Sequence, residues 1–275
     1  MQNAGIAALG LNWRYLAFDV DPDNLRAALE GARAMRFMGI NLTVPHKILA
    51  VDMVDVLDES AKAYGAVNTV LFEARHGEEQ WRPLREFAET PQQIRSHGFN
   101  TDADAIATAL RQDLGLELPG KTVLLLGAGG AGQAAALELA SQKVAELFLV
   151  NRTRSKAEAL AAEIALRHPE VRVTIGYPAR SVDLALNATS LGLKAADDLP
   201  FDKAQFSVSK VRAVYDMIYR PAETLLLKSA KAAGCRTANG LGMLLYQGAK
   251  ALEIWTGQAA PLDIMRRALK QNVYG

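Results

Sequence analysis

Apolar positions along the chain alternate between strand-like runs and helix-like spacing. In the second half, short runs that are apolar throughout, such as 122–126 and 182–186, are separated by segments with apolar residues every three or four positions. Strands that are apolar throughout are typical of a parallel sheet covered on both faces by helices. The pattern therefore predicts βαβ units and an α/β fold.

From residue 121 onward the prediction is specific. We expect strands at 122–126, 146–151, 171–175, 182–186 and 211–217, and helices at 130–141, 154–167, 243–255 and 261–271. The first hundred residues predict helices at 3–9, 21–38, from 45 and from 101 to 114, and strands at 13–20, 40–44 and 68–73. Residues 74–98 are polar, and we interpret them as a long surface excursion between two strands.

Composition and net charge indicate a globular protein and disfavour a nucleic-acid-binding one. With 275 residues, one to two domains are expected, and 50% hydrophobic with 22% charged residues is the composition of a globular protein. Lys and Arg (31) nearly cancel Asp and Glu (30), so the net charge of +1 gives no electrostatic footprint for nucleic acid.

The cysteine, the histidines and the apolar stretches of the chain indicate its cellular location and whether it binds a metal. The single cysteine, Cys235, excludes an internal disulfide, and the four histidines have no metal-ligand spacing, so we expect no metal. The apolar stretch 123–140 contains four glycines and favours a strand, a turn and a helix over a membrane span. Without a basic leader near Met1, we expect a cytoplasmic protein that is not bound to a membrane.

A glycine-rich turn carries the first functional signal. The segment Gly127, Ala128, Gly129, Gly130, Ala131, Gly132 matches G-x-G-x-x-G between a predicted strand and a predicted helix. Such a turn lets the backbone approach a pyrophosphate closely, and the helix N-terminus supplies N–H groups and partial positive charge. The segment therefore predicts dinucleotide binding.

The end of the next predicted strand indicates which dinucleotide binds. An NAD site expects a carboxylate about 20 residues beyond the glycines. Here the stretch reads Asn151, Arg152, Thr153, Arg154, Ser155, Lys156, with three cations and no carboxylate. Cations and a hydroxyl suit a 2′-phosphate, so the sequence favours NADP(H).

Three segments in the first half carry unusual polar residues. Residues 41–47 (N-L-T-V-P-H-K) place Lys47 in a first helical turn, where the helix dipole disfavours a cation. Residues 65–69 (G-A-V-N-T) place Asn68 at the start of a strand, and residues 100–102 (N-T-D) place Asp102 in a first helical turn.

Together these segments resemble the shikimate dehydrogenase family. The resemblance extends over nearly the whole chain through N-L-T-V-P-H-K, G-A-V-N-T, N-T-D, G-A-G-G-A, N-R-T-R-S-K, N-A-T-S-L-G, Y-D-M-I-Y and G-L-G-M-L-L-Y-Q. It implies reversible, NADPH-dependent reduction of 3-dehydroshikimate to shikimate, a step of aromatic amino acid (chorismate) biosynthesis. It also implies two α/β domains with the active site in the cleft: a substrate domain at 1–101 plus 240–275, and a Rossmann-type NADP-binding domain at 102–239.

The resemblance also implies roles for individual residues. Lys47 is expected to be the catalytic lysine and Asp102 its partner, and the expected substrate ligands are Thr43, Asn68, Tyr219 and Gln247. Gly127 to Ala131 and Asn151, Arg152, Thr153 and Lys156 are expected to hold the cofactor phosphates, with Met217 and Gly240 on the nicotinamide side. Reduction of a ketone leaves a developing alkoxide that needs a proton donor, which Lys47 can provide.

The chain departs from the family pattern at its start. The family begins with a strand and a Ser-x-Ser segment whose hydroxyls bind the substrate carboxylate, and the 275 residues begin in the helical segment that follows these. Two other functions stay open: a dehydrogenase of another polyol acid, such as quinate or an amino-substituted analogue, and a non-catalytic NADP-binding relative. The expected partner is the small-molecule substrate, and the chain is expected to be a monomer or a homodimer.

Overall fold

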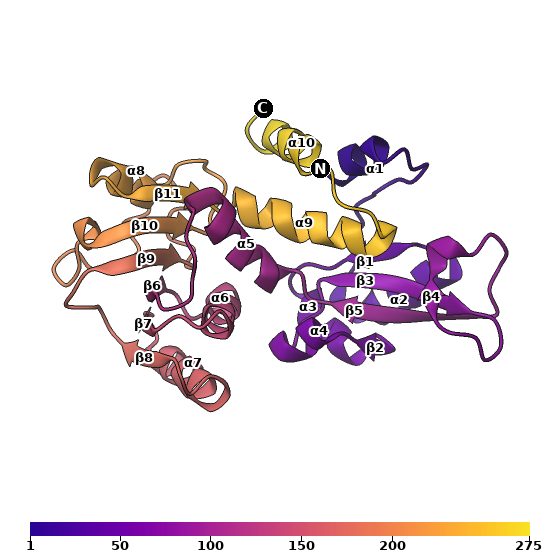
Figure 1. The fold of residues 1–275 in the computed structure, drawn as a ribbon, viewed down its shortest axis with the longest axis horizontal. Coiled ribbons are helices and arrows are strands. Elements are labelled where there is room, and N and C mark those ends of the chain that lie inside the picture. The colour runs from indigo at the N-terminus through magenta and orange to yellow at the C-terminus, as the bar shows by residue number, and fades with distance from the viewer. The chain divides into compact units, whose positions relative to one another are not determined.

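A computed structural model describes all of residues 1–275 and divides the chain into two compact units. Unit 1 comprises Met1–Asp102, Gln247–Val273 and Gly275, and unit 2 comprises Ala103–Tyr246 and Tyr274. The chain thus leaves unit 1 at Asp102 and returns at Gln247, whereas we expected the return at 240. Both units combine helices with a sheet (Figure 1), which confirms the predicted α/β class.

Unit 2 contains one six-stranded sheet, in which all strands are parallel. Its order, β11-β10-β9-β6-β7-β8, is the doubly wound order of dinucleotide-binding domains, with the switch point between β6 and β9. The strands are β6 (Thr122–Leu126), β7 (Glu146–Val150), β8 (Arg172–Ile175), β9 (Val182–Asn187), β10 (Val211–Asp216) and β11 (Arg236–Asn239). The all-parallel sheet confirms the parallel, Rossmann-type sheet that the sequence predicted for this part of the chain.

The helices of unit 2 precede, separate and follow its strands along the chain. They are α5 (Asp102–Leu114, starting at the last residue of unit 1), α6 (Gly130–Ser141), α7 (Arg154–Arg167), α8 (Leu225–Ala232), the 3-10 helix η4 (Val208–Lys210) and the first part of α9 (Leu241–Thr256). α7 packs on β7 and β8, and α8 packs on β10 and β11. Buried side chains such as Leu124, Phe148 and Val214 form the core beneath them.

Unit 1 contains a five-stranded mixed sheet of order β1-β3-β5-β2, with β4 paired to β3. The strands are β1 (Gly39–Asn41), β2 (Val56–Leu57), β3 (Thr69–Arg75), β4 (Arg82–Pro83) and β5 (Gln93–Phe99). The helices are α1 (Gln2–Ala8), α2 (Leu25–Ala34), α3 (His46–Leu49), α4 (Glu59–Tyr64), the rest of α9, α10 (Leu262–Tyr274) and the 3-10 helices η1 (Pro22–Asn24), η2 (Ala50–Asp52) and η3 (Leu84–Glu86).

One contact fixes α9 on the sheet of unit 1. The indole N–H of Trp255 donates to the Val70 carbonyl at 2.9 Å. A Cβ at Gly39 would lie 2.0 Å from the same indole nitrogen, so only glycine fits beneath this ring. This close approach holds the part of α9 that carries Gln247 against unit 1.

Two predicted elements in unit 1 are wrong. Residues 74–98 are not an excursion, because β5 pairs antiparallel with β3 from Thr69↔Phe99 to Arg75↔Gln93. Most residues of β5 are polar, and the guanidinium carbons of Arg75 and Arg95 lie 4.6 Å and 4.4 Å from the ring centroid of Trp81. Local hydrophobicity therefore did not reveal this hairpin.

The second wrong prediction is the strand at 13–20, where the backbone is irregular and pairs with no strand. Its alternating pattern includes Leu16 and Phe18, which are 65% and 64% exposed. The predicted helix 21–38 also ends early, at Ala34, because Arg36 has a positive φ of 59°.

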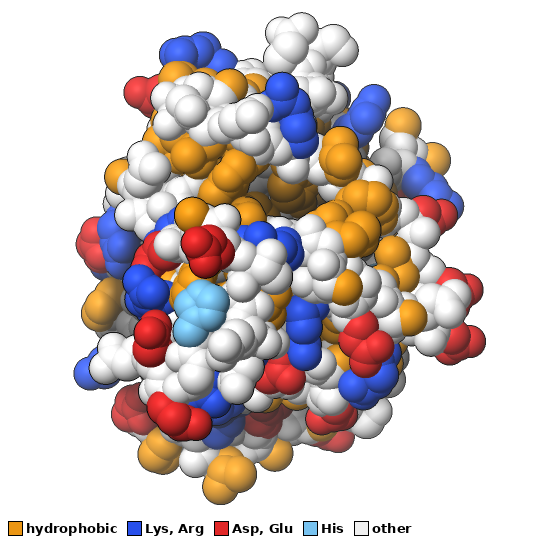
Figure 2. All heavy atoms as spheres, turned by 90° about the vertical axis from the view of Figure 1, so that its right-hand side faces the viewer, with side chains coloured by type: hydrophobic (Ala, Val, Ile, Leu, Met, Phe, Trp, Pro, Cys, Tyr) orange, Lys and Arg blue, Asp and Glu red, His pale blue; other side chains and the backbone are white.

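Three features of the surface and the helices concern possible contacts with nucleic acid, membranes and metal ions. Lys, Arg, Asp and Glu side chains are interspersed over the face drawn in Figure 2, and charges of one sign do not gather there over an extended area. None of the helices combines the length and the apolar character that a membrane span requires. No group of three or more His, Cys, Asp or Glu side chains could hold a metal ion.

Candidate active site and cofactor site

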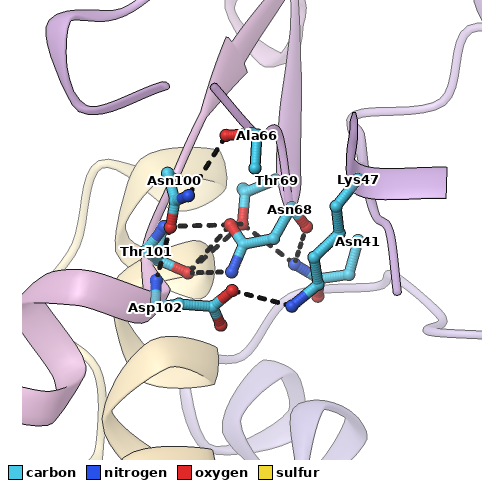
Figure 3. Close-up of polar contacts among 8 residues, drawn as sticks. All are labelled: Asn41, Lys47, Ala66, Asn68, Thr69, Asn100, Thr101 and Asp102. Carbon is cyan, nitrogen blue, oxygen red and sulfur yellow. Dashed lines mark hydrogen bonds and ion pairs between the residues drawn. The ribbon is translucent and has the colours of Figure 1, made fainter. Parts of the chain in front are cut away.

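Lys47 and Asp102 form an ion pair in unit 1. The Lys47 ammonium donates to the Asp102 carboxylate, with 2.7 Å between Nζ and Oδ2 (Figure 3). The two side chains are 24% and 17% exposed, so the pair is largely but not completely withdrawn from water. The fold thus brings together two residues that are 55 positions apart in the chain.

Backbone contacts position Lys47. It lies in the short helix α3, and its carbonyl oxygen accepts the Val67 N–H at 2.8 Å. Thr43 lies just before α3, where its carbonyl accepts the His46 N–H at 2.8 Å and its side chain is exposed. The backbone just before β3, at Val67, therefore holds the helical turn that carries Lys47.

A buried amide positions Asp102. The Asn68 side-chain oxygen accepts the Thr101 backbone N–H at 2.9 Å, and the Asn68 amide nitrogen donates to the Thr101 hydroxyl at 3.1 Å (Figure 3). Asn68 and Thr101 are each 2% exposed. The Asn100 side-chain oxygen in turn accepts the Asp102 N–H at 3.0 Å, so the N–H of the first residue of α5 has a side-chain acceptor.

The network continues to residues that sequence reasoning missed. The Asn41 amide donates to the Thr69 hydroxyl at 3.0 Å and to the Asn68 carbonyl at 3.2 Å, and it accepts from the Tyr15 hydroxyl at 3.0 Å. Asn41 stands in the segment 41–47 that we singled out, so its polar side chain at a strand end was an available signal. Tyr15 lies in the irregular segment 11–20, and no sequence signal pointed to it.

The glycine-rich turn follows β6 at the switch point of the sheet. Gly127 has a φ of 104°, and a Cβ at Gly132 would lie 2.1 Å from the Gly127 carbonyl oxygen. By contrast, a Cβ at Gly129 or Gly130 would meet nothing within 4 Å. Gly129, Gly130 and Ala131 are exposed at the start of the 12-residue helix α6, whose N-terminus has no side-chain cap. This open, uncapped turn fits a pyrophosphate.

Asn151 links this turn to the basic segment. Its side-chain oxygen accepts the Ala128 N–H at 3.0 Å, and its amide donates to the Thr153 carbonyl at 2.8 Å. Arg152, Thr153 and Lys156 are exposed beside it. Arg154 instead pairs with Glu158 at 2.8 Å, along one face of α7. The residues present therefore fit an anionic 2′-phosphate next to the glycine turn.

Met217 and Gly240 are brought together within unit 2. A Cβ at Gly240 would lie 2.0 Å from the Met217 carbonyl oxygen, and the Gly240 N–H donates to the Ile218 carbonyl at 3.2 Å. Tyr219 is 40% exposed, and its carbonyl accepts from the Tyr274 hydroxyl at 2.7 Å. Gln247 is half-buried on α9 in unit 1.

Comparison with family profiles covers most of the chain. Residues 1–70 match the shikimate dehydrogenase substrate binding domain, residues 109–189 match shikimate / quinate 5-dehydrogenase, and residues 240–270 match the shikimate 5′-dehydrogenase C-terminal domain. The three matches follow the order of the units along the chain.

Individual relatives agree with the profiles. The chain is 38% identical to a shikimate dehydrogenase (NADP(+)) of Methanocaldococcus jannaschii over 99% of this chain and 91% of that protein. A solved shikimate 5-dehydrogenase of Thermus thermophilus in complex with NADP(H) and shikimate is 34% identical, with a TM-score of 0.78 over 98% of this chain and 92% of the other.

A relative with another name is equally similar in structure. The ligand-free 5-ketofructose reductase of Gluconobacter sp. strain CHM43 is 34% identical, with a TM-score of 0.81 over 98% of this chain and 92% of the other. The identity and coverage of these relatives far exceed what a shared fold alone produces. This chain therefore belongs to the shikimate dehydrogenase family.

Proposed function

We propose that this protein is an NADP-dependent oxidoreductase that interconverts 3-dehydroshikimate and shikimate. The Lys47–Asp102 ion pair carries the proposal, because it places a proton donor beside a carboxylate, and Lys47 lies within residues 1–70, which match the substrate binding domain. NADP(H), when bound, supplies or accepts the hydride. The reaction class is oxidation and reduction at a CH–OH group.

Unit 1 supplies the residues that donate and accept the proton of the reaction. When a ketone is reduced, negative charge develops on its oxygen, and the Lys47 ammonium can donate a proton to that atom. Asp102 holds the lysine at 2.7 Å and has a second carboxylate oxygen, Oδ1, as a further acceptor for a substrate hydroxyl. In the oxidative direction Lys47 takes the proton back. Asp102 therefore orients both the donor and the substrate.

The remaining substrate contacts belong to polar side chains with spare donors or acceptors. We assign Thr43, Asn68 and Gln247 to substrate hydroxyls, and Tyr219 to the substrate carboxylate or the nicotinamide. The exposed hydroxyl of Thr43 is available as both donor and acceptor. The Asn68 amide nitrogen keeps one N–H beyond the one given to Thr101.

Unit 2 supplies the cofactor site of this proposal. Backbone N–H groups from Gly127 to Ala131 would hold the pyrophosphate, and Asn151 would keep the turn in place. Arg152, Thr153 and Lys156 would bind the 2′-phosphate, which selects NADP(H) over NAD(H). Met217 and Gly240 would line the nicotinamide side.

The first test is turnover by the purified chain. We expect NADP⁺ reduction with shikimate, followed by NADPH absorbance, and much slower reduction of NAD⁺. Lys47→Ala should lower kcat at least about a hundredfold, the range for loss of a general acid. Lys62→Ala is the matched control, since Lys62 also pairs with a carboxylate at 2.7 Å but is 54% exposed on α4. An unchanged kcat in Lys47→Ala would remove Lys47 from the mechanism.

A second candidate is reduction of a different polyol ketone. The likeness to 5-ketofructose reductase favours testing it, since that protein has the same identity to this chain as the Thermus enzyme. Parallel assays with NADPH and 5-ketofructose, and with quinate and either cofactor, separate the candidates. Turnover of only one substrate identifies it. NADPH binding without turnover of any substrate would support a non-catalytic relative.

A further inference from the structure

Three neighbouring strands of the sheet in unit 2 each end in a polar residue, and these residues form a row. In the paired register, Asp216 at the end of β10 lies between Asn187 at the end of β9 and Asn239 at the end of β11. Leu126, the last residue of β6 before the glycine turn, pairs with Asn187 on the other side. In doubly wound sheets, ligands bind at this carboxyl edge, next to the switch point.

Asp216 is the buried centre of this row. It is 0% exposed, and its carboxylate accepts three bonds from neutral donors. Oδ1 accepts from the Asn187 amide at 2.9 Å and from the Ile218 N–H at 3.1 Å, and Oδ2 accepts from the Thr224 hydroxyl at 2.6 Å. Burial raises the pKa of this carboxyl group, since desolvation outweighs the three hydrogen bonds.

These bonds tie two surface segments together. Asn187 holds the turn 187–192: its side-chain oxygen accepts the Thr189 N–H at 3.0 Å, and its amide donates to the Leu191 carbonyl at 3.1 Å. Ile218 and Thr224 lie in the segment 217–224, which contains Met217 and Tyr219 and ends at the N-cap of α8. Asp216 therefore joins the two segments through one carboxylate.

The same segments reach the glycine turn. A Cβ at Gly127 would lie 2.9 Å from the Ala188 carbonyl oxygen, so the turn 187–192 packs directly on the cofactor turn. A Cβ at Gly192 would lie 3.2 Å from both Ile218 and Thr224, so the two segments are in close packing contact. A change at Asp216 would thus be transmitted to both ends of the proposed cofactor site.

We propose that Asp216 is a positioning residue for the cofactor: through Asn187, Ile218 and Thr224 it holds the segments 187–192 and 217–224 in the arrangement that receives NADP(H). The inference rests on the proposed cofactor site and adds a residue that touches neither substrate nor cofactor. Its role is to form hydrogen bonds with these three residues in a buried place, so the shape of the side chain and its hydrogen-bonding atoms matter rather than its charge.

The test compares Asp216→Leu with Asp216→Asn. Leucine keeps the branched shape and the number of heavy atoms but leaves buried donors unpaired, so the Kd for NADPH should rise at least about tenfold, the effect of roughly 1.4 kcal/mol. Asparagine can accept from Asn187 and Ile218 through its oxygen and donate to Thr224, so its Kd should stay within about threefold of wild type.

A second pair of variants covers the case in which Asp216→Leu does not fold. Thr224→Val removes the donor to Oδ2 and should raise the Kd for NADPH, whereas Thr224→Ser keeps that hydroxyl and should restore it. NADPH binding is measured by fluorescence, at a temperature where circular dichroism shows each variant folded. Wild-type affinity in folded Asp216→Leu, or in Thr224→Val, would overturn the inference.

The binding readout separates this inference from the proposed function. A wild-type protein that binds NADPH but does not turn over shikimate contradicts the proposed substrate alone, and the variants still decide the role of Asp216. An active wild-type protein whose Asp216→Leu variant binds NADPH equally well contradicts the inference alone. A wild-type protein that binds no NADPH overturns both.

Discussion

Asn68 and Thr101 are joined by two opposed hydrogen bonds: the Asn68 oxygen accepts the Thr101 backbone N–H at 2.9 Å, and the Asn68 amide donates to the Thr101 hydroxyl at 3.1 Å. Thr101 directly precedes Asp102, between the end of β5 and the start of α5, and Asn68 directly precedes β3. The position of the Asp102 carboxylate, and through it that of Lys47, therefore depends on a buried amide and a buried hydroxyl.

Thr101→Val should lower kcat for shikimate oxidation by about tenfold, because it leaves the buried Asn68 amide without one partner. Thr101→Ser keeps the hydroxyl and should retain most of the activity. Steady-state kinetics on both variants, with NADPH binding as a control for unit 2, checks this. Equal kinetics in the two variants would show that the hydroxyl does not position Asp102.

Lys47 and Asp102 should be energetically coupled. Removal of either partner breaks the same ion pair, so the double variant Lys47→Met/Asp102→Asn should be little worse than the worse single variant. The measurement is kcat/KM in a double-mutant cycle. Strictly additive losses would mean that the two residues act independently, which would contradict the proposed mechanism.

The basic segment should select the cofactor. Replacement of both Arg152 and Lys156 by alanine should lower the preference for NADP⁺ over NAD⁺ by at least about tenfold, since two charged partners of the 2′-phosphate are lost. Arg154→Ala is the matched control, because Arg154 is occupied by Glu158. The ratio of kcat/KM for the two cofactors is the readout, and an equal change in the control would weaken the assignment.

Gly132 should tolerate no side chain. A Cβ there would lie 2.1 Å from the Gly127 carbonyl oxygen, so Gly132→Ala must displace the turn, at a cost of about 1–3 kcal/mol of stability and a loss of NADPH affinity. Gly31→Ala, in the middle of α2 with open space around it, should instead stabilise the chain by up to about 1 kcal/mol. Thermal unfolding and NADPH titration of both variants test the contrast.

Acid should remove a contribution of Glu73 to stability. Burial raises the pKa of this carboxyl group, but hydrogen bonds and charge from His97 and Arg95 outweigh burial and hold the pKa below its usual range. The folded state then binds its proton at lower pH than the unfolded state. The stabilisation is therefore present above the unfolded pKa and is lost as the pH falls through the folded value.

Urea unfolding at several pH values tests this point. The free energy of unfolding of wild type should exceed that of Glu73→Gln near pH 6, and the difference should shrink toward about pH 3. Glu79→Gln, at a glutamate that is 61% exposed and 3.9 Å from Arg82, should show no such trend. A difference that grows on acidification would mean that the sign of the effect is reversed.

Much of unit 2 could be predicted from the sequence. The predicted helices 130–141 and 154–167 have the same bounds as α6 and α7, and the strand 122–126 coincides with β6. These elements are defined by local signals: apolar runs, helical periodicity and glycines at the turns. Such signals act within a few residues, so the α/β class and the glycine turn could be predicted without knowledge of the fold.

Features that depend on residues far apart in the chain became visible only in the folded protein. The hairpin of β3 and β5 is stabilised by cross-strand pairs such as Glu73–Arg95, which become neighbours only when the strands meet in register. The family resemblance named Lys47 and Asp102, but only the fold shows that they lie 2.7 Å apart. Asp216 looks like an ordinary aspartate until burial and the row of strand ends around it give the carboxylate three partners.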